Sequence, residues 1–339
     1  LGHQRLSKRY ALGILSSDCI SSSAYGSEQI LIALLPAFGL AAFAILMPMT
    51  AVVLAILLLI TLSYRNVIDV YTKTGGAYIV SRDNFGPVVA QIAAVALMLD
   101  YIVTVAIQSA AGVAAIISTF PSLGPWKIHM IFAVIALLTY GNLRGVKEAG
   151  KVFALPTYFF VMCMLTVFGM GLYRLANGTL PVMDTDMPGA VPVGEAQGLL
   201  TFAAMFILLR AFANGGSSLT GLEAISDGVA LFKAPEHVNA KRTLVVMSTL
   251  LGTLVLGVSF FAHKIHAVPY ESGVPTVISQ IAKVTVGTGT FGSIMFILVQ
   301  LATMLILFAG ANTTYSAFPL LVNFVATDGY LPRQLTKRG

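Results

Sequence analysis

Charged residues are scarce in this sequence. Only 10% of its 339 residues are Asp, Glu, Lys or Arg, whereas soluble domains have about 25%. The two cysteines, Cys19 and Cys163, both lie in apolar runs, which argues against a disulfide framework and against a cysteine metal site. There is no His-Glu-x-x-His motif and no nucleophile–base pairing by spacing. We therefore predict that the chain is not an enzyme and needs no cofactor.

Apolar residues are abundant instead. They make up 57% of the chain, and several runs reach the roughly 20 residues that cross a bilayer. The net charge of +6 does not indicate nucleic-acid binding, because the basic residues gather in short loops between these runs. This composition predicts an all-α integral membrane protein whose surroundings are the lipid bilayer.

We predict a single transmembrane transport domain over residues 1–339 with about eight spans. Loop charges alternate along the chain, from the basic Arg5, Lys8 and Arg9 to the acidic loop 177–197, and place the N-terminus in the cytoplasm. We expect a polar loop over 65–86, turning at Gly75-Gly76, and short interfacial helices in an external segment over 263–290. The predicted spans cover residues 11–40, 42–64, 87–118, 127–143, 152–176, 198–232, 242–262 and 291–325.

Two of these spans are interrupted by small and hydroxyl residues. The first breaks near Ser21 to Gly26 and the sixth at Asn214 to Ser218, each with a Glu close behind. Paired interrupted segments in corresponding positions are typical of transporter binding sites at the bilayer midplane. Five spans separate the two breaks, which predicts a five-plus-five inverted repeat with spans 1 and 6 broken. We expect the remaining spans to lie outside these 339 residues.

Ionisable residues inside the predicted bilayer are candidate functional groups, because they are costly there. Neutral oxygens at similar depth come from Tyr25, Thr220, Tyr101 and Thr104, and the last two share a helix face. Such oxygens, with carbonyls freed by an unwound helix, suit an alkali cation, while the carboxylates could instead carry protons. Several of these groups have structural alternatives: an Asp100–Arg210 ion pair, or water-facing and capping positions for Glu28 and Asp227. The ionisable set is Asp18, Glu28, Asp100, Arg210, Glu223 and Asp227.

At the two breaks the sequence resembles a known group. Leu-Ser-Ser-Asp with Ser-Ser-Ser-Ala-Tyr-Gly-Ser-Glu-Gln-Ile, then Gly-Gly-Ala-Tyr-Ile-Val-Ser, Asp-Tyr-Ile-Val-Thr-Val-Ala and Leu-Thr-Gly-Leu-Glu-Ala-Ile-Ser are similar to the amino acid-polyamine-organocation (APC) superfamily. Within it, they resemble the KimA-like high-affinity potassium importers of the KUP type. The resemblance covers essentially the whole chain.

The resemblance implies a LeuT/APC-type fold of twelve spans and potassium uptake by proton symport in the bacterial cell membrane. It also implies a homodimer with a cytoplasmic C-terminal region beyond residue 339, and inhibition by cyclic di-AMP. Where the family pattern has serine, this chain has Gln108, whose amide oxygen could still coordinate the ion. Glu223, Asp18 and Asp100 are the candidates for proton coupling. By position, the potassium-binding residues would be Asp18, Tyr25, Tyr101, Thr104, Gln108, Thr220 and Glu223.

The alternative is an amino-acid or amine permease, which has the same fold and would use the same central site. Such permeases bind the substrate carboxylate at a glycine-rich break, whereas this break has Ser21 to Ser23 and Tyr25 with Asp18 just before. Clustered carboxylates repel a carboxylate ligand and attract a cation. The sequence therefore favours a metal ion or an amine over an amino acid, and the resemblance implies that the ion is potassium.

Overall fold

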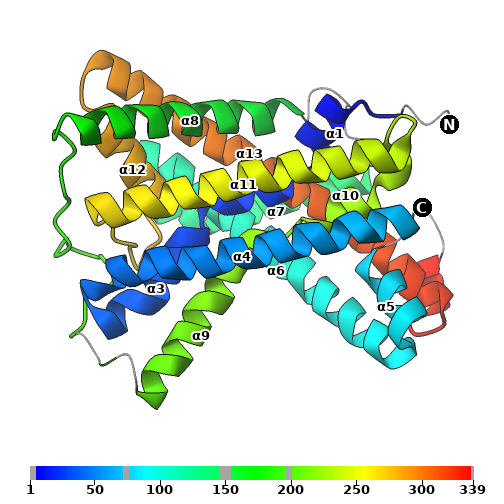
Figure 1. The fold of residues 1–339 in the computed structure, drawn as a ribbon. Helices are drawn as coiled ribbons and strands as arrows, with labels where there is room; N and C mark the ends of the chain where they lie inside the picture. Colours follow the sequence, from blue (N-terminus) through cyan, green and yellow to red (C-terminus); the bar gives the residue numbers. More distant parts are fainter. Residues whose placement is uncertain (1–4, 72–75, 145–153, 196–197, 199–200, 337–339) are drawn as a thin grey trace.

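The structure is a computed structural model, and it describes all residues except 1–4, 72–75, 145–153, 196–197, 199–200 and 337–339. The described residues are almost entirely helical, with two isolated β-bridges, Leu6 to Phe232 and Ala190 to Tyr270 (Figure 1). The elements are α1 (Lys8–Leu15), α2 (Ser17–Ser21), η1 (Ser22–Ala24), α3 (Gly26–Phe38), α4 (Ala41–Val70), α5 (Ala77–Phe85), α6 (Pro87–Thr119), η2 (Pro121–Trp126), α7 (Lys127–Leu143), α8 (Leu155–Ala176), α9 (Phe202–Gly216), η4 (Ser217–Leu219), α10 (Glu223–Asp227), η5 (Val229–Leu231), α11 (Glu236–Ile265), α12 (Val277–Val286), α13 (Thr290–Thr327) and η6 (Arg333–Thr336).

Seven helical segments among the described residues are long and apolar enough to cross a bilayer. The broken segment from α1 to α3 precedes them and corresponds to the first predicted span. Helix α7 begins and ends at the predicted residues, 127 and 143, and α6 and α13 differ from prediction by one or two residues. Long apolar runs that end at Pro, Gly or charged residues explain this agreement. The chain is a multi-pass membrane protein.

The predicted polar loop over 65–86 is wrong in part. Helix α4 continues to Val70, and α5 occupies residues 77–85. Tyr78 of α5 is 1% exposed, and its hydroxyl donates to Asp328 Oδ2 at 2.7 Å. This burial stabilises a short helix whose polar composition alone suggests a loop. The turn expected at Gly75-Gly76 begins outside the described residues, since Gly75 is not among them.

The segment predicted to be external contains the helix α12, and eight of its ten residues are buried. That it is interfacial stays a prediction. It packs against α8, α11 and α13 inside the bundle. The apolar side chains Ile278, Ile281 and Ala282 belong to the largest hydrophobic cluster of the described residues. The exposed Lys283 marks the one face of α12 that is not packed against the bundle.

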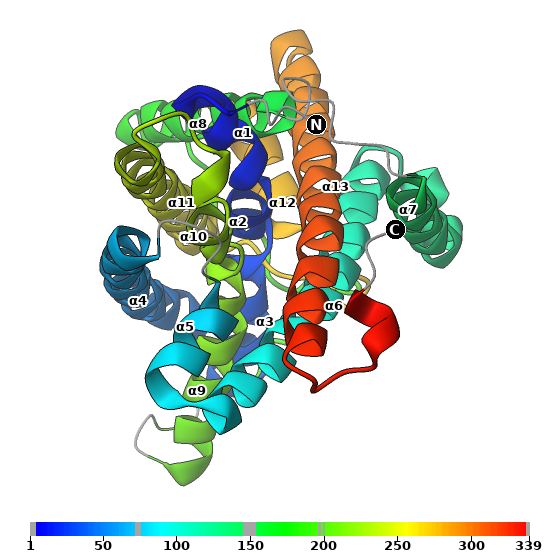
Figure 2. The ribbon, with the colours of Figure 1, turned by 90° about the vertical axis from the view of Figure 1, so that its right-hand side faces the viewer.

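The broken first segment runs through the middle of the bundle. Figure 2 shows α2 between the α4–α11 pair on one side and the α6–α13 pair on the other. Helices α6 and α13 have the most extensive interface between two helices. The described parts nearest the two termini lie at the same end of the bundle (Figure 1). The two interruptions are therefore enclosed by long, continuous helices that hold them in place.

Candidate functional site

The first interruption is caused by three consecutive serines. Each hydroxyl turns back to a carbonyl three residues earlier: Ser21 to Asp18 O at 2.7 Å, Ser22 to Cys19 O at 2.6 Å and Ser23 to Ile20 O at 2.7 Å. Such bonds compete with the helical backbone pattern. The helix tightens into η1, leaves helical geometry at Tyr25 (φ −126°, ψ −16°) and resumes as α3.

The second interruption lies slightly later than predicted. Asn214, Gly215 and Gly216 remain in α9, and the chain leaves helical geometry at Thr220, which is extended (φ −65°, ψ 154°). Gly221 then has φ +79°, a conformation that favours glycine. Two glycines weaken a helix but do not end it, whereas one residue in the left-handed region does.

The two interruptions touch each other. Ser22 Oγ donates to the carbonyl oxygen of Ser218 at 2.7 Å. A Cβ placed on Gly26 would lie 2.6 Å from Ser218 Cβ, and one on Gly221 would lie 2.8 Å from Asp18 Oδ2. The fold therefore brings the second break directly against the carboxylate of the first.

Asp18 is the centre of this contact and is only 6% exposed. Its Oδ1 accepts a 2.6 Å hydrogen bond from Gln108 Nε2, and its Oδ2 accepts from Thr314 Oγ1 at 3.5 Å. Burying an ionised carboxylate is costly unless donors or a cation compensate it. Two neutral donors compensate it only in part, so this site favours a cation or a proton.

Gln108 contacts Asp18 through its amide nitrogen, and the predicted ion ligation by its oxygen stays a prediction. Its Nε2, not its oxygen, faces Asp18 and also donates to Ser21 Oγ at 3.0 Å. Its Oε1 is buried and has no hydrogen-bond partner among the described residues. It lies near Gly310 of α13, where a Cβ would be 2.6 Å from that oxygen. Gln108 thus supports the carboxylate as a donor and keeps an unused acceptor close by.

The buried face of α6 carries the predicted neutral oxygens. Tyr101 and Thr104 are 5% and 4% exposed, while the intervening Ile102 and Val103 are 58% and 52% exposed. Gln108 lies one turn further along the same face. Tyr25, at the end of the first break, is 5% exposed. Of the predicted ligands, Gln108 donates a hydrogen bond to Asp18, and Tyr101 lines one cavity with it.

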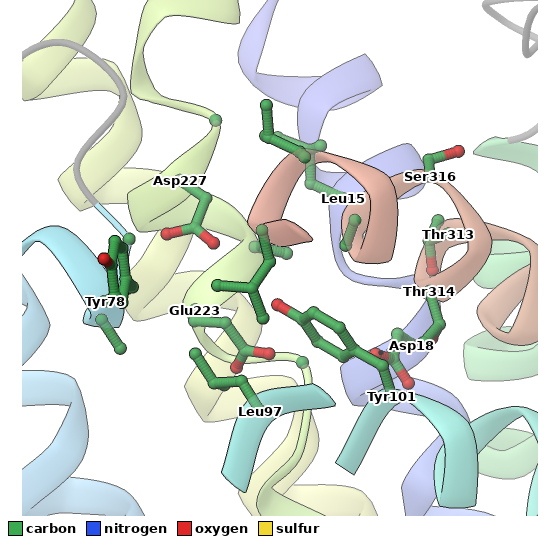
Figure 3. A pocket seen from close by; sticks show the side chains of 18 of the residues that line it. Leu15, Asp18, Tyr78, Leu97, Tyr101, Glu223, Asp227, Thr313, Thr314 and Ser316 are labelled. Carbon is green, nitrogen blue, oxygen red and sulfur yellow. Dashed lines mark hydrogen bonds between the residues drawn. The ribbon is translucent and has the colours of Figure 1, made fainter. Parts of the chain in front are cut away.

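A cavity of about 250 Å³ extends from this point. Three carboxylates line it, from Asp18, Glu223 and Asp227, together with Tyr101 and Thr314. Figure 3 shows the Tyr101 ring between Asp18 and Glu223, with Asp227 beyond Glu223 near Tyr78. Among the described residues that line the cavity there is no Lys, Arg or His. The described part of its lining therefore gathers carboxylates without a basic side chain.

Some predicted residues lie elsewhere. Asp100 is half-buried next to Tyr101 and does not line the cavity. Arg210 is exposed, and none of the four ion pairs of the described residues joins it to Asp100, so the alternative of an Asp100–Arg210 pair is wrong. Glu28 is 7% exposed, and Glu28 Oε2 accepts a hydrogen bond from Val277 N at 3.0 Å. It caps another helix instead of facing water.

Sequence reasoning missed Thr314 and left Asp227 open between a functional group and a water-facing or capping position. Thr314 lies in the run Asn312 to Ser316, a polar stretch in the otherwise apolar α13, which was the available signal. Asp227 follows Glu223 by four residues on α10, so the two share a face. The side-chain oxygen Asp227 Oδ1 is buried without a partner among the described residues. Groups of three His, Cys, Asp or Glu suited to a resident metal are absent from this described part.

Comparisons with known proteins show which family the chain belongs to. Residues 11–339 match the family model described as amino acid permease. The chain is 41% identical over 340 residues to the potassium transporter KimA of Bacillus subtilis (strain 168), covering 100% of this chain and 53% of that protein. The chain thus spans about half the length of that curated relative. With a family of permeases matched over nearly its whole length, and paired helix breaks at its centre, this chain belongs to the amino acid permease family of the APC superfamily.

Proposed function

We propose that the protein containing this chain is a secondary active transporter that imports potassium across the bacterial cell membrane by proton symport. The ion would bind where the two broken segments meet, around Asp18. The observation that carries this proposal is the composition of the cavity: three carboxylates line it, and the described lining residues include no basic side chain. A substrate carboxylate would be repelled there, whereas a cation would be stabilised.

The residues around Asp18 have suitable roles for a dehydrated alkali cation. Asp18 would be ionised and supply the charge. Tyr25 and Thr220, one from each break, would supply hydroxyl oxygens, and carbonyls freed by the 3-10 turn and the extended Thr220 would replace further water. The free Oε1 of Gln108 would be a further ion ligand, as the sequence predicts, while its Nε2 would orient Asp18.

Glu223 is the proposed proton carrier. It begins α10 directly after the second break and lines the cavity. Asp227, one turn later, would keep the local field negative and favour uptake of either a proton or a cation. Asp18 and Asp100 remain alternative coupling groups, and Asp100 would act from beside the cavity and not from its wall.

An organic amine is the second candidate substrate, and it has one specific observation in its favour. The cavity is larger than a single ion needs, and apolar residues such as Leu97, Leu320 and Phe324 line it beside the carboxylates. This mixture suits an ammonium group on an apolar stem. The relative whose name carries potassium is 41% identical over the whole chain, which favours potassium over the amine.

Orientation and assembly complete the proposal. The basic N-terminal segment supports a cytoplasmic α1 end, and the α12 end would then face outward. A homodimer and inhibition by cyclic di-AMP stay predictions for a cytoplasmic region beyond residue 339.

The test is rubidium and potassium uptake by the full-length parent in a bacterial strain that lacks its own potassium uptake. Asp18→Asn removes the central charge and keeps the side-chain shape, so uptake should fall at least about a hundredfold, as expected for a buried charged contact worth a few kcal/mol. Asp184→Asn makes the same change on an exposed loop and should leave uptake unchanged.

Two outcomes would count against the proposal. Accumulation of a labelled amine without rubidium uptake by the parent would move the substrate to the second candidate. Equal uptake by Asp18→Asn and Asp184→Asn would remove the ion from the first break. For the coupling step, Glu223→Gln should transport rubidium without accompanying proton entry, and unchanged proton entry with this variant would reassign the carrier.

A further inference from the structure

Helix α12 closes the end of the bundle that lies away from the cavity. It is surrounded by α8, α11 and α13, and Ile278 and Ile281 pack in the same cluster as Leu31 and Leu34 of α3. The cavity, in contrast, opens among α5, α10 and the later part of α13. The site around Asp18 is therefore reached from one end and covered at the other.

Glu28 links α12 to the broken first segment by a polar contact. It lies in the first turn of α3, three residues after Tyr25, and is 7% exposed. Its Oε2 accepts a 3.0 Å hydrogen bond from the backbone N–H of Val277, the first residue of α12. The first N–H groups of a helix lack internal partners, and a carboxylate is the strongest acceptor for them.

Other polar contacts hold α12 and the residues just before it, from Val268 onward, to different neighbours. Lys127 donates to the carbonyl oxygen of Ser272 from the start of α7. Gln280 bonds both backbone groups of Val268, at 3.1 and 2.7 Å, and so stabilises the segment internally. Ser279 donates to Gln300 of α13 at 2.8 Å. Of the hydrogen bonds among the described residues, the one from Val277 to Glu28 is the one that joins α12 to α3.

We propose that Glu28 is a positioning residue that couples the outer half of the broken first segment to α12 and keeps this end of the site closed. Tyr25 of the proposed ion site and Glu28 lie within one helical turn of each other, so a change at the break moves α3 and, through Glu28, the N-terminus of α12. This inference rests on the proposal that the protein is a transporter, because a cover that releases is useful only if the site opens to both sides.

The experiment measures how readily α12 becomes accessible. The full-length parent, with Cys19→Ala and Cys163→Ala, carries the nearly isosteric Ser279→Cys on α12, which is 2% exposed before substitution. A charged, membrane-impermeant thiol reagent is added to right-side-out and to inside-out vesicles. Glu28→Gln keeps the shape but weakens a charge-assisted bond, so labelling should rise about fivefold, from the α12 side alone.

A second variant removes the donor of the same hydrogen bond. Val277→Pro removes the N–H and leaves Glu28 intact. Proline is tolerated at the first position of a helix, and the preceding Thr276 is already extended (φ −68°, ψ 158°), as proline requires. This variant should raise labelling as Glu28→Gln does, and Glu28→Asp should fall between the parent and Glu28→Gln. Glu271→Gln removes an exposed carboxylate from the same segment and serves as the matched control.

The proposal is overturned if Glu28→Gln and Val277→Pro label no faster than the parent while their melting temperatures match it. It is also overturned if labelling rises equally from both membrane sides, or equally in Glu271→Gln, because that pattern reports general loosening. Labelling requires no potassium. If the parent takes up no rubidium, the proposed substrate is refuted, but the labelling result for Glu28 can still be interpreted.

Discussion

The two helix breaks have similar sequences but different structures. In the first, serine hydroxyls bond within their own turn and the chain departs from helical geometry at Tyr25, with every residue from Ser16 to Ser27 buried. In the second, the backbone becomes extended at Thr220 and left-handed at Gly221. The first break presents side chains, above all Asp18, whereas the second presents backbone.

This difference suggests a division of labour. A tightly packed break fixes the position of a buried charge, which a transporter site requires for selectivity. A break with extended backbone can rotate about few residues, which is how hinges absorb large changes. We therefore expect substitutions at the first break to change ion affinity, and substitutions at the second to change both stability and turnover.

The largest effect is expected at Gly221. Alanine there must adopt φ +79°, which costs about 1–2 kcal/mol, and its Cβ would lie 2.8 Å from Asp18 Oδ2 and from the Cys19 backbone N. Gly221→Ala should therefore abolish uptake and lower the melting temperature by several degrees. Uptake assays and thermal unfolding of purified protein measure the two effects.

Gly216→Ala is the matched control for this substitution. Gly216 ends α9 with helical angles (φ −59°, ψ −24°), and a Cβ there would meet no atom within 4 Å. Alanine should stabilise the helix by up to about 1 kcal/mol and leave uptake nearly unchanged. If both glycines tolerate alanine equally, the second break does not depend on its left-handed residue.

The next largest effect concerns the donor to Asp18. Gln108→Leu keeps the side-chain size but removes the 2.6 Å bond from Nε2, leaving a buried carboxylate with less support. The apparent rubidium affinity should fall about tenfold, as expected for the loss of a bond to a charged group, with little change in maximal rate. A changed maximal rate at constant affinity would place Gln108 in the conformational step instead.

The sequence predicted the existence of both breaks but not this difference between them. Helix propensity is a local property, and it is low both at Ser21 to Ser23 and at Gly215-Gly216, so it does not distinguish the two breaks. The extended Thr220 and left-handed Gly221 depend on the approach of Asp18 and Cys19 from a segment about 200 residues away, which no local pattern records. For the same reason Thr314 was missed, and the bond from the Gln108 amide nitrogen to Asp18 was not foreseen.

A smaller effect is expected from removing the hydrogen bond that joins the two breaks. Ser22 Oγ bonds both Cys19 O in its own turn and Ser218 O in the second break, whereas Ser23 Oγ bonds Ile20 O only. Ser22→Ala should cost about 1 kcal/mol and weaken uptake a few-fold, since one tie between the breaks is lost. Ser23→Ala should lose only a local bond, and equal defects in the two variants would show that the contact between breaks has no special importance.

The smallest expected effect concerns support of the second break through α5. A Cβ on Gly76 at the start of α5 would lie 3.0 Å from Asp227 Oδ1. Asp328 at the end of α13 accepts from Tyr78 at 2.7 Å and from Arg82 Nη1 at 2.8 and 3.0 Å. The hydrogen bonds from Arg82 lower the pKa of Asp328. A lowered pKa stabilises the folded state above the unfolded value of about 3.9, and this contribution is lost as the pH falls below it.

Asp328→Asn should therefore lower stability by no more than about 1 kcal/mol at pH 7, because partly exposed ion pairs contribute little. The difference from the parent should shrink as the pH falls below about 3.9 and vanish once the pH is below the lowered pKa of Asp328. Thermal unfolding at the two pH values measures this, with Asp83→Asn, which pairs with the same arginine at 3.2 Å, as the control. If α5 supports the second break and not the first, Asp328→Asn will slow uptake slightly without changing rubidium affinity. A change in rubidium affinity would instead connect α5 to Asp18 and the first break.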